Sequence, residues 1–375
     1  MKLVLFFTYG VSLKRWAELG ILKRETSFYH RLMEDYGIEV LFVTYGDASD
    51  RAWESELKGI ELLPIYERMR QPTLEILGLL QSLLIPTTIR KELKGSDLLK
   101  TNQIWGGWVA VLAKWQVRKP LLTRCGYDFY EFSRMRGKRG FFRLFTWAFS
   151  YFTYNIADQI HVATNTDRKR IIKRFFVPPD KIHVVPNWIN TNLFHPYTND
   201  RTLRLLFVGR LHDQKQLTLL FDAIQNTNID VDIVGTGPEF DRLQSLANLT
   251  KISVTFKGQS STNQMPQLYN HYAIYVICSK YEGNPKTLLE AMACGCAVIG
   301  TDVPGIKDVI EHRTNGLLVP EDPVALREAI LLLHNDKPLR ERLGRAARSY
   351  VLANNTLEPS LVYEYQIYKK LSATR

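Results

Sequence analysis

Cysteines and metal-binding patterns are scarce in this sequence. The 375 residues contain four cysteines, at positions 125, 278, 294 and 296, which is too few for a disulfide framework in a chain of this size. No His or Cys pairs around them have the spacing of a zinc site. We therefore predict reduced thiols, no bound metal and a cytoplasmic protein. The Cys294-Gly-Cys296 pair is interpreted as two small buried residues beside a helix-ending glycine rather than as a redox-active pair.

Long apolar segments are absent as well. The longest, Leu74 to Pro86, is broken by one acidic residue, one glycine and two polar residues, and it is shorter than the roughly 20 residues that a helix needs to span a bilayer. The N-terminal run Leu3–Phe7 is too short for the apolar part of a secretory signal, and no small-residue cleavage site follows it. We predict no transmembrane helix and interpret Leu3–Phe7 as a first buried strand.

Acidic residues are in deficit, mainly in the first half of the chain. The whole sequence carries a net charge of +11. Residues 1–190 hold 29 Lys and Arg against 19 Asp and Glu, a balance of +10, whereas residues 191–375 hold 20 against 19, a balance of +1. A basic domain attracts nucleic acid, an anionic membrane surface, or an acidic or phosphorylated substrate. Charge alone leaves all three partners open.

The segment from Phe129 to Tyr154 interleaves basic and aromatic side chains. Its members include Arg134, Arg136, Lys138, Arg139, Arg143, Phe141, Phe142, Phe145, Trp147, Phe149, Tyr151 and Phe152. Cations beside rings suit a membrane interface, where they meet anionic headgroups and the edge of the acyl chains. A basic loop that leads into a buried helix explains the same pattern, and both interpretations stay open.

Short apolar runs alternate with helical patterns along the whole chain. In the first half we expect strands at Leu3–Phe7, Glu39–Thr44, Gln159–Ala163 and Ile182–Val185, and helices at Glu25–Asp35 and Asp167–Phe175. In the second half we expect strands at Leu203–Val208, Val231–Val234, Ser253–Lys257, Ile274–Cys278 and Ala297–Gly300, and helices near Leu217–Ile224 and Pro238–Leu249. This rhythm is typical of α/β proteins with parallel sheets covered on both faces. The chain length favours two such domains, joined near Pro186–Asn190.

The segment from Glu282 to Gly295 carries the strongest signal of a binding site. Asn284 suits the N-cap of a helix, Pro285 its first position and Gly295 the position after its end, so a helix is predicted over 285–294. It follows a predicted strand. The helix N-terminus therefore faces the carboxyl end of a parallel strand, where free N–H groups and the helix dipole bind phosphate.

Two carboxylates of this segment have different places. Glu282 lies in the loop before the helix, whereas Glu290 lies one to two turns into it. They cannot share one small site, and a phosphate at the helix N-terminus would lie between them. Glu290 then suits the hydroxyls of a ribose and Glu282 a group beyond the phosphates. The alternative is a solvated helix residue and an ordinary loop charge.

A second set of residues follows the predicted strand Leu203–Val208. Gly209 permits close backbone approach, and Arg210 and Lys215 are fixed cations suited to a diphosphate. A diphosphate leaving group needs its charge neutralised as its bond to the sugar breaks, and such side chains can do this without a metal. Two surface cations are the alternative.

These motifs occur in a recognisable order. Pro186-Asn187, Gly209-Arg210 with Lys215, Gly235-Thr-Gly237-Pro238, and Glu282-Gly283 with Glu290-Ala291-Met292-Ala293 together closely resemble the retaining glycosyltransferases of the GT-B fold, family 4. The resemblance implies two Rossmann-like doubly wound domains that face each other across a cleft. Residues 1–188 would bind the acceptor, residues 189–355 the nucleotide-sugar donor, and the helical residues 356–375 would cross back to the first domain.

The resemblance also implies a reaction. A sugar passes from a nucleoside-diphosphate sugar to a glycan, lipid-linked or acidic acceptor with retention of configuration, without a metal or another cofactor, and the leaving phosphate takes the acceptor proton. Rival interpretations are a GT-B nucleotide-sugar epimerase and a non-catalytic GT-B partner subunit. A nucleic-acid-binding protein would explain the charge, but no binding module is recognisable and no nucleic acid partner is expected.

Site residues follow by the same resemblance. Arg210, Lys215 and Glu282 are the predicted catalytic residues, with the two cations on the diphosphate and Glu282 near the donor sugar. Glu290 would bind the ribose. Further donor contacts would come from the backbone of Gly283, Asn284, Lys286 and Thr287, and from close approach at Gly209, Gly258 and Gly10.

One motif departs from the family pattern. Family members often carry His-Gly-x-Asp in the first domain, with the His facing the donor sugar, whereas this chain has Cys125-Gly126-Tyr127-Asp128. Cys125 cannot copy an imidazole. Either this branch dispenses with that His, or another residue such as Asp128 makes the contact.

Overall fold

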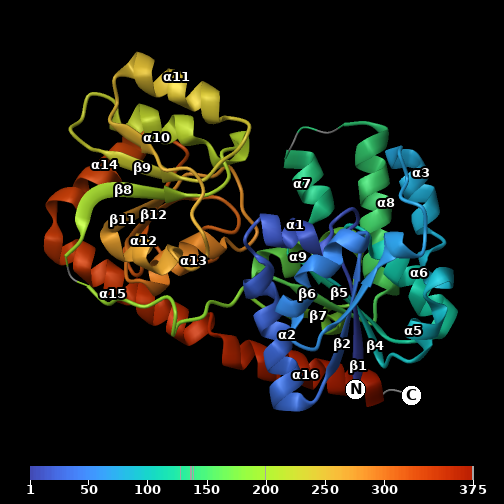
Figure 1. Ribbon diagram of the computed structural model, residues 1–375. Coiled ribbons are helices and arrows are strands. Elements are labelled where there is room, and N and C mark those ends of the chain that lie inside the picture. Colours follow the sequence, from blue (N-terminus) through green and yellow to red (C-terminus); the bar gives the residue numbers. More distant parts are fainter. Residues whose placement is uncertain (127, 136, 138, 199, 374–375) are drawn as a thin grey trace. The chain divides into compact units, whose positions relative to one another are not determined.

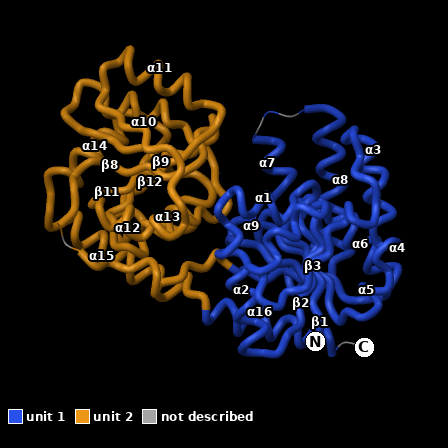
Figure 2. Tube along the Cα trace, in the orientation of Figure 1, with its two compact units in different colours: residues 1–185, 358–375 blue, residues 186–357 orange. Residues whose placement is uncertain are grey.

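The computed structural model describes residues 1–126, 128–135, 137, 139–198 and 200–373 (Figure 1). The chain divides into two compact units (Figure 2). Residues 1–185 together with 358–375 form the first unit, and residues 186–357 form the second. Each unit is built on an open sheet whose paired strands are all parallel.

The first unit contains a seven-stranded sheet in the order β3-β2-β1-β4-β5-β6-β7. Its strands are β1 (Lys2–Phe6), β2 (Glu39–Thr44), β3 (Glu61–Pro64), β4 (Leu98–Thr101), β5 (Leu121–Cys125), β6 (Gln159–Val162) and β7 (Ile182–Val184). Its helices are α1 (Leu13–Glu18), α2 (Leu22–Tyr36), α3 (Glu75–Ser82), α4 (Ile85–Thr88), α5 (Arg90–Lys94), α6 (Gly107–Val117), α7 (Phe129–Met135), α8 (Phe141–Ile156), α9 (Asn165–Phe175) and α16 (Leu357–Ala373).

The second unit contains a six-stranded sheet in the order β10-β9-β8-β11-β12-β13. Its strands are β8 (Thr202–Val208), β9 (Val231–Val234), β10 (Val254–Phe256), β11 (Tyr272–Ile277), β12 (Ala297–Thr301) and β13 (Leu317–Val319). Its helices are α10 (Leu217–Ile224), α11 (Phe240–Thr250), α12 (Met265–His271), α13 (Lys286–Ala293), α14 (Pro323–Asn335) and α15 (Lys337–Asn354). Single turns of 3₁₀ helix also occur, among them η4 (Asp213–Lys215) in this unit.

Both faces of the second sheet are covered. In β8, Leu205 and Phe207 pack into one apolar cluster with residues of α10, α11 and α14. The alternating Leu206 and Val208 pack into a second cluster with residues of α12, α13 and α15. Because successive strand residues point to opposite faces of a sheet, each face carries its own helical layer. The second half of the strand, residues 205–208, therefore appears in the sequence as a continuous apolar run.

The predicted fold class of two Rossmann-like α/β domains is confirmed. The predicted strands Glu39–Thr44 and Val231–Val234 and the helix Leu217–Ile224 have the bounds that the structure shows. Four strands were not predicted, namely β3, β4, β5 and β13. They are only three to five residues long, and two of them contain a cation, Lys100 or Arg124. Their apolar signal is too short to separate from the helices around them.

Helix α16 belongs to the first unit and forms a buried ion pair there. Glu364 of α16 pairs with Lys100 of β4, and the two side chains are 6% and 2% exposed. The Lys100 ammonium also donates a hydrogen bond of 2.8 Å to the Tyr368 hydroxyl. Burial raises the pKa of Glu364, but the Lys100 charge, the nearby His161 and the hydrogen bonds from Lys100 and Tyr368 together lower the pKa to about 2. Burial lowers the pKa of the neighbouring His161 to about 3, so this ring is neutral at pH 7.

The four cysteines are free and buried, and for Cys294 and Cys296 burial was predicted. Burial raises the pKa of the Cys296 thiol to about 11, and it raises that of Cys294 as well. Both groups are therefore protonated at neutral pH, which suits buried structural cysteines rather than a redox pair. Among the residues that the structure describes, no helix is both long enough and apolar enough to cross a bilayer.

Candidate functional site

The carboxyl ends of β8 and β9 are held together by glycines. Gly235 has a φ of +143°, and a Cβ there would lie 1.9 Å from the Gly209 carbonyl oxygen. A Cβ on Gly237 would lie 2.2 Å from the carbonyl oxygen of Leu211. The Gly235 N–H donates a hydrogen bond of 2.7 Å to the Gly258 carbonyl. Only glycine fits these positions, and the Gly-Thr-Gly turn fixes the loop that carries Arg210.

Helix α13 differs from the prediction at its start. It begins at Lys286, not at Pro285, and Pro285 takes the cap position without a side-chain hydrogen bond. Asn284 was predicted to cap this helix, which is wrong. Its amide oxygen instead accepts a hydrogen bond of 2.9 Å from the Asn187 N–H, and its carbonyl accepts one of 2.6 Å from the Asn187 amide. Gly295, with a φ of +77°, lies just past the helix end as predicted.

The beginning of α13 offers free donors. The N–H groups of Gly283, Asn284 and Thr287 donate no hydrogen bond to any residue that the structure describes. The Thr287 hydroxyl is fixed by the Tyr275 hydroxyl at 2.9 Å, and Tyr275 reaches toward the Val208 carbonyl at 3.4 Å. Tyr275 thus links the helix start to the end of β8. Unpaired N–H groups at a helix N-terminus are suited to bind an anion.

Lys215 and Glu282 form an ion pair in this region. The Lys215 ammonium lies 2.5 Å from Glu282 Oε1, and the two side chains are 17% and 10% exposed. The Ser279 hydroxyl donates a second hydrogen bond, of 2.6 Å, to the same oxygen. Backbone contacts fix the loop, since the Glu282 N–H donates to the Pro304 carbonyl at 3.0 Å. A Cβ on Gly305 would lie 2.4 Å from the Glu282 carbonyl oxygen. Lys215 and Glu282 are therefore brought together as one unit.

Arg210 comes shortly before Lys215 in the sequence, but its side chain has a different environment. Its side chain is exposed, and it forms no hydrogen bond or ion pair with another residue of the described part of the chain. Its guanidinium is consequently available to a ligand. Lys215, in contrast, already has an anionic partner, which the sequence did not reveal.

Glu290 lies inside α13, separate from Glu282. It is 5% exposed, and its Oε2 accepts a hydrogen bond of 3.0 Å from the Tyr269 hydroxyl of α12. Burial and the nearby Glu290 carboxylate raise the pKa of Tyr269 well above its usual value, so this hydroxyl remains a donor. The alternative of a solvated helix residue is wrong for Glu290. The two carboxylates have different partners, Tyr269 for Glu290 and Lys215 with Ser279 for Glu282.

Sequence reasoning missed the residues that orient the carboxylates. Tyr269 holds Glu290 from 21 residues away, and no spacing rule connects them. Ser279 precedes Glu282 by three residues. A hydroxyl so close in the sequence to a loop carboxylate is a signal that could have identified this contact. Of the other predicted donor contacts, Lys286 lies with its ammonium 5.9 Å from the Trp188 ring centroid, and Gly258 has a φ of +68° with open space at its Cβ position.

Three predicted site residues belong to the first unit. Gly10 follows β1 and has a φ of +75°. Cys125 ends β5 and is fully buried, with the Tyr154 hydroxyl 3.0 Å from its sulfur. Asp128 is 3% exposed and accepts hydrogen bonds from the first N–H groups of α7, at 3.1 Å from Tyr130. Burial raises the pKa of Asp128. The geometry of Cys125 and Asp128 suits structural roles within this unit.

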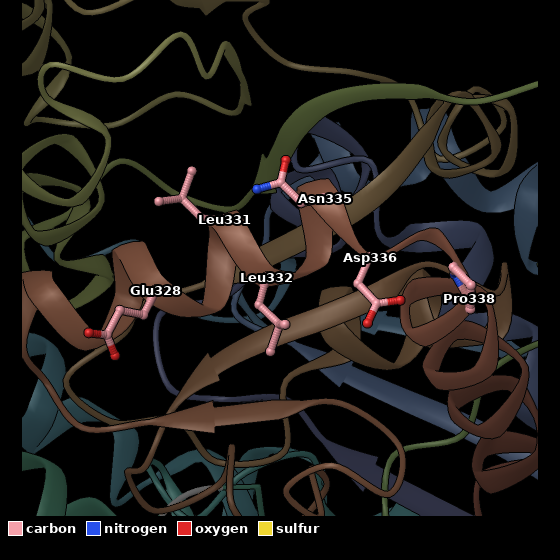
Figure 3. A pocket seen from close by; sticks show the side chains of 6 residues that line it. All are labelled: Glu328, Leu331, Leu332, Asn335, Asp336 and Pro338. Carbon is pink, nitrogen blue, oxygen red and sulfur yellow. The ribbon is translucent and has the colours of Figure 1, made fainter.

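A pocket elsewhere in the second unit involves none of the predicted site residues. Its volume is about 570 Å³, and it lies where α14 gives way to α15 (Figure 3). It is lined by Glu328, Leu331, Leu332, Asn335, Asp336 and Pro338. Asp336 already caps α15 by accepting from the Leu339 N–H at 2.8 Å. Within the described residues, no group of three or more His, Cys, Asp or Glu is placed to hold a metal ion.

Comparison with known families matches both halves of the chain. A family model described as glycosyl transferases group 1 matches residues 191–350, and one described as glycosyltransferase family 4 matches residues 29–193. The chain is 29% identical over 147 residues to an uncharacterised glycosyltransferase of Methanocaldococcus jannaschii, which covers 39% of this chain and 42% of that protein. It is 27% identical over 226 residues to the alpha-maltose-1-phosphate synthase of Mycobacterium tuberculosis, covering 52% and 58%. The matches span about half the length of these curated relatives.

Solved structures resemble the whole chain. Sucrose-phosphate synthase from Thermosynechococcus elongatus superposes with a TM-score of 0.81 at 20% identity, covering 100% of both chains. HepE of Anabaena, solved in complex with UDP and glucose, superposes with a TM-score of 0.78 at 17% identity, covering 99% of this chain and 100% of that one. Such identities establish the fold alone. Taken with the two family models, they show that this chain belongs to the family 4 glycosyltransferases of the GT-B fold.

Proposed function

We propose that the protein transfers a hexose from a nucleoside-diphosphate sugar to a glycan, lipid-linked or acidic acceptor, with retention of configuration and without a metal. Residues 189–355, within the second unit, bind the donor, and the basic first unit binds the acceptor. The observation that carries this proposal is the Lys215–Glu282 ion pair beside the free N–H groups that precede and begin α13.

In this proposal the donor diphosphate lies at the start of α13. The N–H groups of Lys286 and Thr287 face the phosphates, and those of Gly283 and Asn284 face sugar hydroxyls. Arg210 is exposed and unpaired among the described residues, so it is free to bind the diphosphate from the β8 side. Glu290, held by Tyr269, accepts the ribose hydroxyls. Gly209, Gly258 and Gly10 allow close backbone approach.

Lys215 and Glu282 then act together. In the absence of donor, Glu282 neutralises the ammonium and holds it in place. When the diphosphate departs, its growing negative charge attracts the same ammonium, and fixed charges of this kind stabilise a transition state without reorganisation. The leaving phosphate takes the proton of the acceptor hydroxyl, which attacks from the same face. No nucleophile from the protein is required.

The partners follow from charge and from the family. The donor is the only co-substrate proposed. HepE of Anabaena was solved with UDP and glucose, which makes UDP-glucose the first donor to test for this chain. The charge of +10 over residues 1–190 favours a phosphorylated, acidic or lipid-linked acceptor at the cytoplasmic face of a membrane. We do not expect a nucleic acid partner.

The donor proposal is tested by thermal unfolding with nucleotide sugars. A ligand that binds only the native state raises its stability, by about 2.7 kcal/mol at 100 times its dissociation constant. We expect one of UDP-, GDP- or ADP-sugars to raise the unfolding temperature of the wild type and to raise it less in Glu290→Gln. Product analysis without acceptor separates transfer from epimerisation. The absence of a shift with every donor contradicts the proposal.

A further inference from the structure

Helix α3 of the first unit packs with its smallest side chains inward. Gly78 and Ser82 are its buried residues. A Cβ on Gly78 would lie 2.6 Å from the Tyr9 hydroxyl oxygen. The Ser82 hydroxyl accepts a hydrogen bond of 2.8 Å from the Trp108 indole of α6. The helix therefore contacts its unit through a narrow strip that has room only for small residues.

The large apolar side chains of α3 and its flanks point outward. With their exposed fractions, they are Leu74 63%, Ile76 72%, Leu77 51%, Leu79 37%, Leu80 59%, Leu83 47% and Leu84 58%. A helix that faces water buries such side chains and exposes polar ones. In this helix the leucines and Ile76 are exposed together with Glu75, whereas a glycine and a serine are buried. An apolar patch of this extent is typical of an interaction surface.

Helix α8 exposes a second set of apolar side chains and is linked to α3 through Trp108. The Trp108 ring that bonds to α3 also packs against Phe149 of α8, with ring centroids 5.6 Å apart, and Figure 1 shows α3 and α8 near one another at one end of the first unit. The first turns of α8 expose Phe141 83%, Phe142 43%, Leu144 63% and Phe145 43%. The name α3–α8 face is used below for the exposed apolar side chains of residues 74–84 and 141–145.

Basic residues border the α3–α8 face. Arg139 precedes α8 and Arg143 lies in its first turn, and both are exposed. Arg143 donates a hydrogen bond of 3.0 Å to the Tyr130 hydroxyl of α7. Residues 129–154 hold five Lys and Arg against a single acid, Glu131. A second copy or a neutral protein partner would cover the apolar residues but would leave this excess of positive charge unexplained.

We propose that the α3–α8 face docks on the surface of an anionic lipid bilayer. The leucines and phenylalanines lie at the boundary of the acyl chains, and the arginines contact the anionic headgroups. Tyr9, which touches α3, directly precedes Gly10 at the carboxyl end of β1, and open α/β sheets bind their ligands at this edge. Among the proposed acceptors, this favours a lipid-linked one. Only that last step rests on the proposed transfer reaction, and the docking itself does not.

Sedimentation of the full chain with vesicles tests the docking. Vesicles of phosphatidylcholine and phosphatidylglycerol in equal parts are compared with vesicles of phosphatidylcholine alone. The test variant is Ile76→Glu with Leu80→Glu, because both side chains are exposed and glutamate favours helix. The matched control is Leu249→Glu with Leu352→Glu in the second unit, 80% and 47% exposed, which adds the same charge.

We expect the wild type and the control pair to bind anionic vesicles, and the test pair to bind at least tenfold more weakly. Replacing Arg139 and Arg143 by Gln should weaken binding to anionic vesicles about fivefold per arginine. Added salt should also weaken this binding. If the α3 pair fails to fold, Phe141→Ser, at a side chain 83% exposed, takes its place.

Three results overturn the docking proposal. In the first, the wild type stays in the supernatant with anionic vesicles. In the second, the test pair binds the vesicles as well as the control pair does. In the third, the wild type is a dimer, the test pair is a monomer, and neither binds vesicles. The last result would assign the α3–α8 face to a second copy. The vesicle assay does not test donor binding. The donor proposal is contradicted separately, if nucleotide sugars raise the unfolding temperature of neither the wild type nor any variant.

Discussion

Replacing Lys215 by alanine tests the centre of the candidate site. The Lys215 ammonium lies 2.5 Å from Glu282 and is held in a loop fixed by the end of β8. If it neutralises the departing diphosphate, its loss removes one fixed charge from the transition state. Losing one such group lowers turnover by about 10²–10³-fold, or about 3–4 kcal/mol. We expect Lys215→Ala to reduce the transfer rate by about 100-fold or more.

The same substitution has a second, structural effect. Glu282 is 10% exposed, and among the described residues only the Ser279 hydroxyl would still bond to its carboxylate side chain. Breaking a fully buried pair costs about 3–5 kcal/mol. Since both members of this pair keep some contact with water, about 1–2 kcal/mol is expected. Arg210→Ala is the matched control, because its exposed side chain has no such partner and its loss should change stability by less than about 0.5 kcal/mol.

Two measurements separate the effects. Release of the nucleoside diphosphate at saturating donor and acceptor gives the transfer rate, and urea unfolding gives the stability. Lys215→Ala should lower both, whereas Arg210→Ala should lower the rate and leave stability almost unchanged. Near-normal turnover of Lys215→Ala would refute its catalytic role. Equal destabilisation by both variants would refute the argument from the ion pair.

Three further predictions concern stability. Burial holds the pKa of His161 at about 3 in the folded state, below the 6.5 of the free side chain, so the unfolded state gains the proton first as the pH falls. The free energy of unfolding that this ring contributes above pH 6.5 is therefore lost as the pH falls towards 3. Between about pH 7 and 5.5, the free energy of unfolding in urea should fall by about 1 kcal/mol more in the wild type than in His161→Gln. Lys100→Met leaves the buried Glu364 without its cation and should destabilise the first unit by about 3–5 kcal/mol, and a second change, Glu364→Leu, should recover most of this loss in thermal unfolding. Gly235→Ala forces a Cβ to 1.9 Å from a carbonyl oxygen and should abolish the donor-induced thermal shift. Gly258→Ala meets open space, and with a φ of +68° it should cost only about 1–2 kcal/mol.

The sequence predicted the second unit better than the first. Strands such as Tyr272–Ile277 are continuous apolar runs, and the helix after Pro285 has signals at both ends. In the first unit, β4 and β5 contain Lys100 and Arg124. A buried lysine is acceptable there only because Glu364 comes from a distant helix, and no local pattern contains that information.

The residues of the candidate site were proposed from the sequence, but their connections could not be. The choice of Arg210, Lys215, Glu282 and Glu290 rests on the family resemblance together with the glycines and helix signals around them. The hydrogen bonds that orient Glu290 and Glu282 come from Tyr269 and Ser279, respectively. The wrong prediction of Asn284 as a helix cap also comes from a tertiary contact. Asparagine is a typical N-cap residue, but here Asn284 accepts hydrogen bonds from Asn187 instead. Tertiary contacts overrode a local preference at that position.

The return of the chain to the first unit sets the order in which the protein is completed on the ribosome. Residues 186–357 emerge before residues 358–375, so the second unit has its whole sequence while Lys100 still lacks Glu364. The two partners are 264 residues apart, and closing so long a loop is slow. Until α16 arrives, a nascent first unit that buries Lys100 holds an ammonium without a counter-ion. The second unit is therefore the first to have its whole sequence available, although it is encoded second.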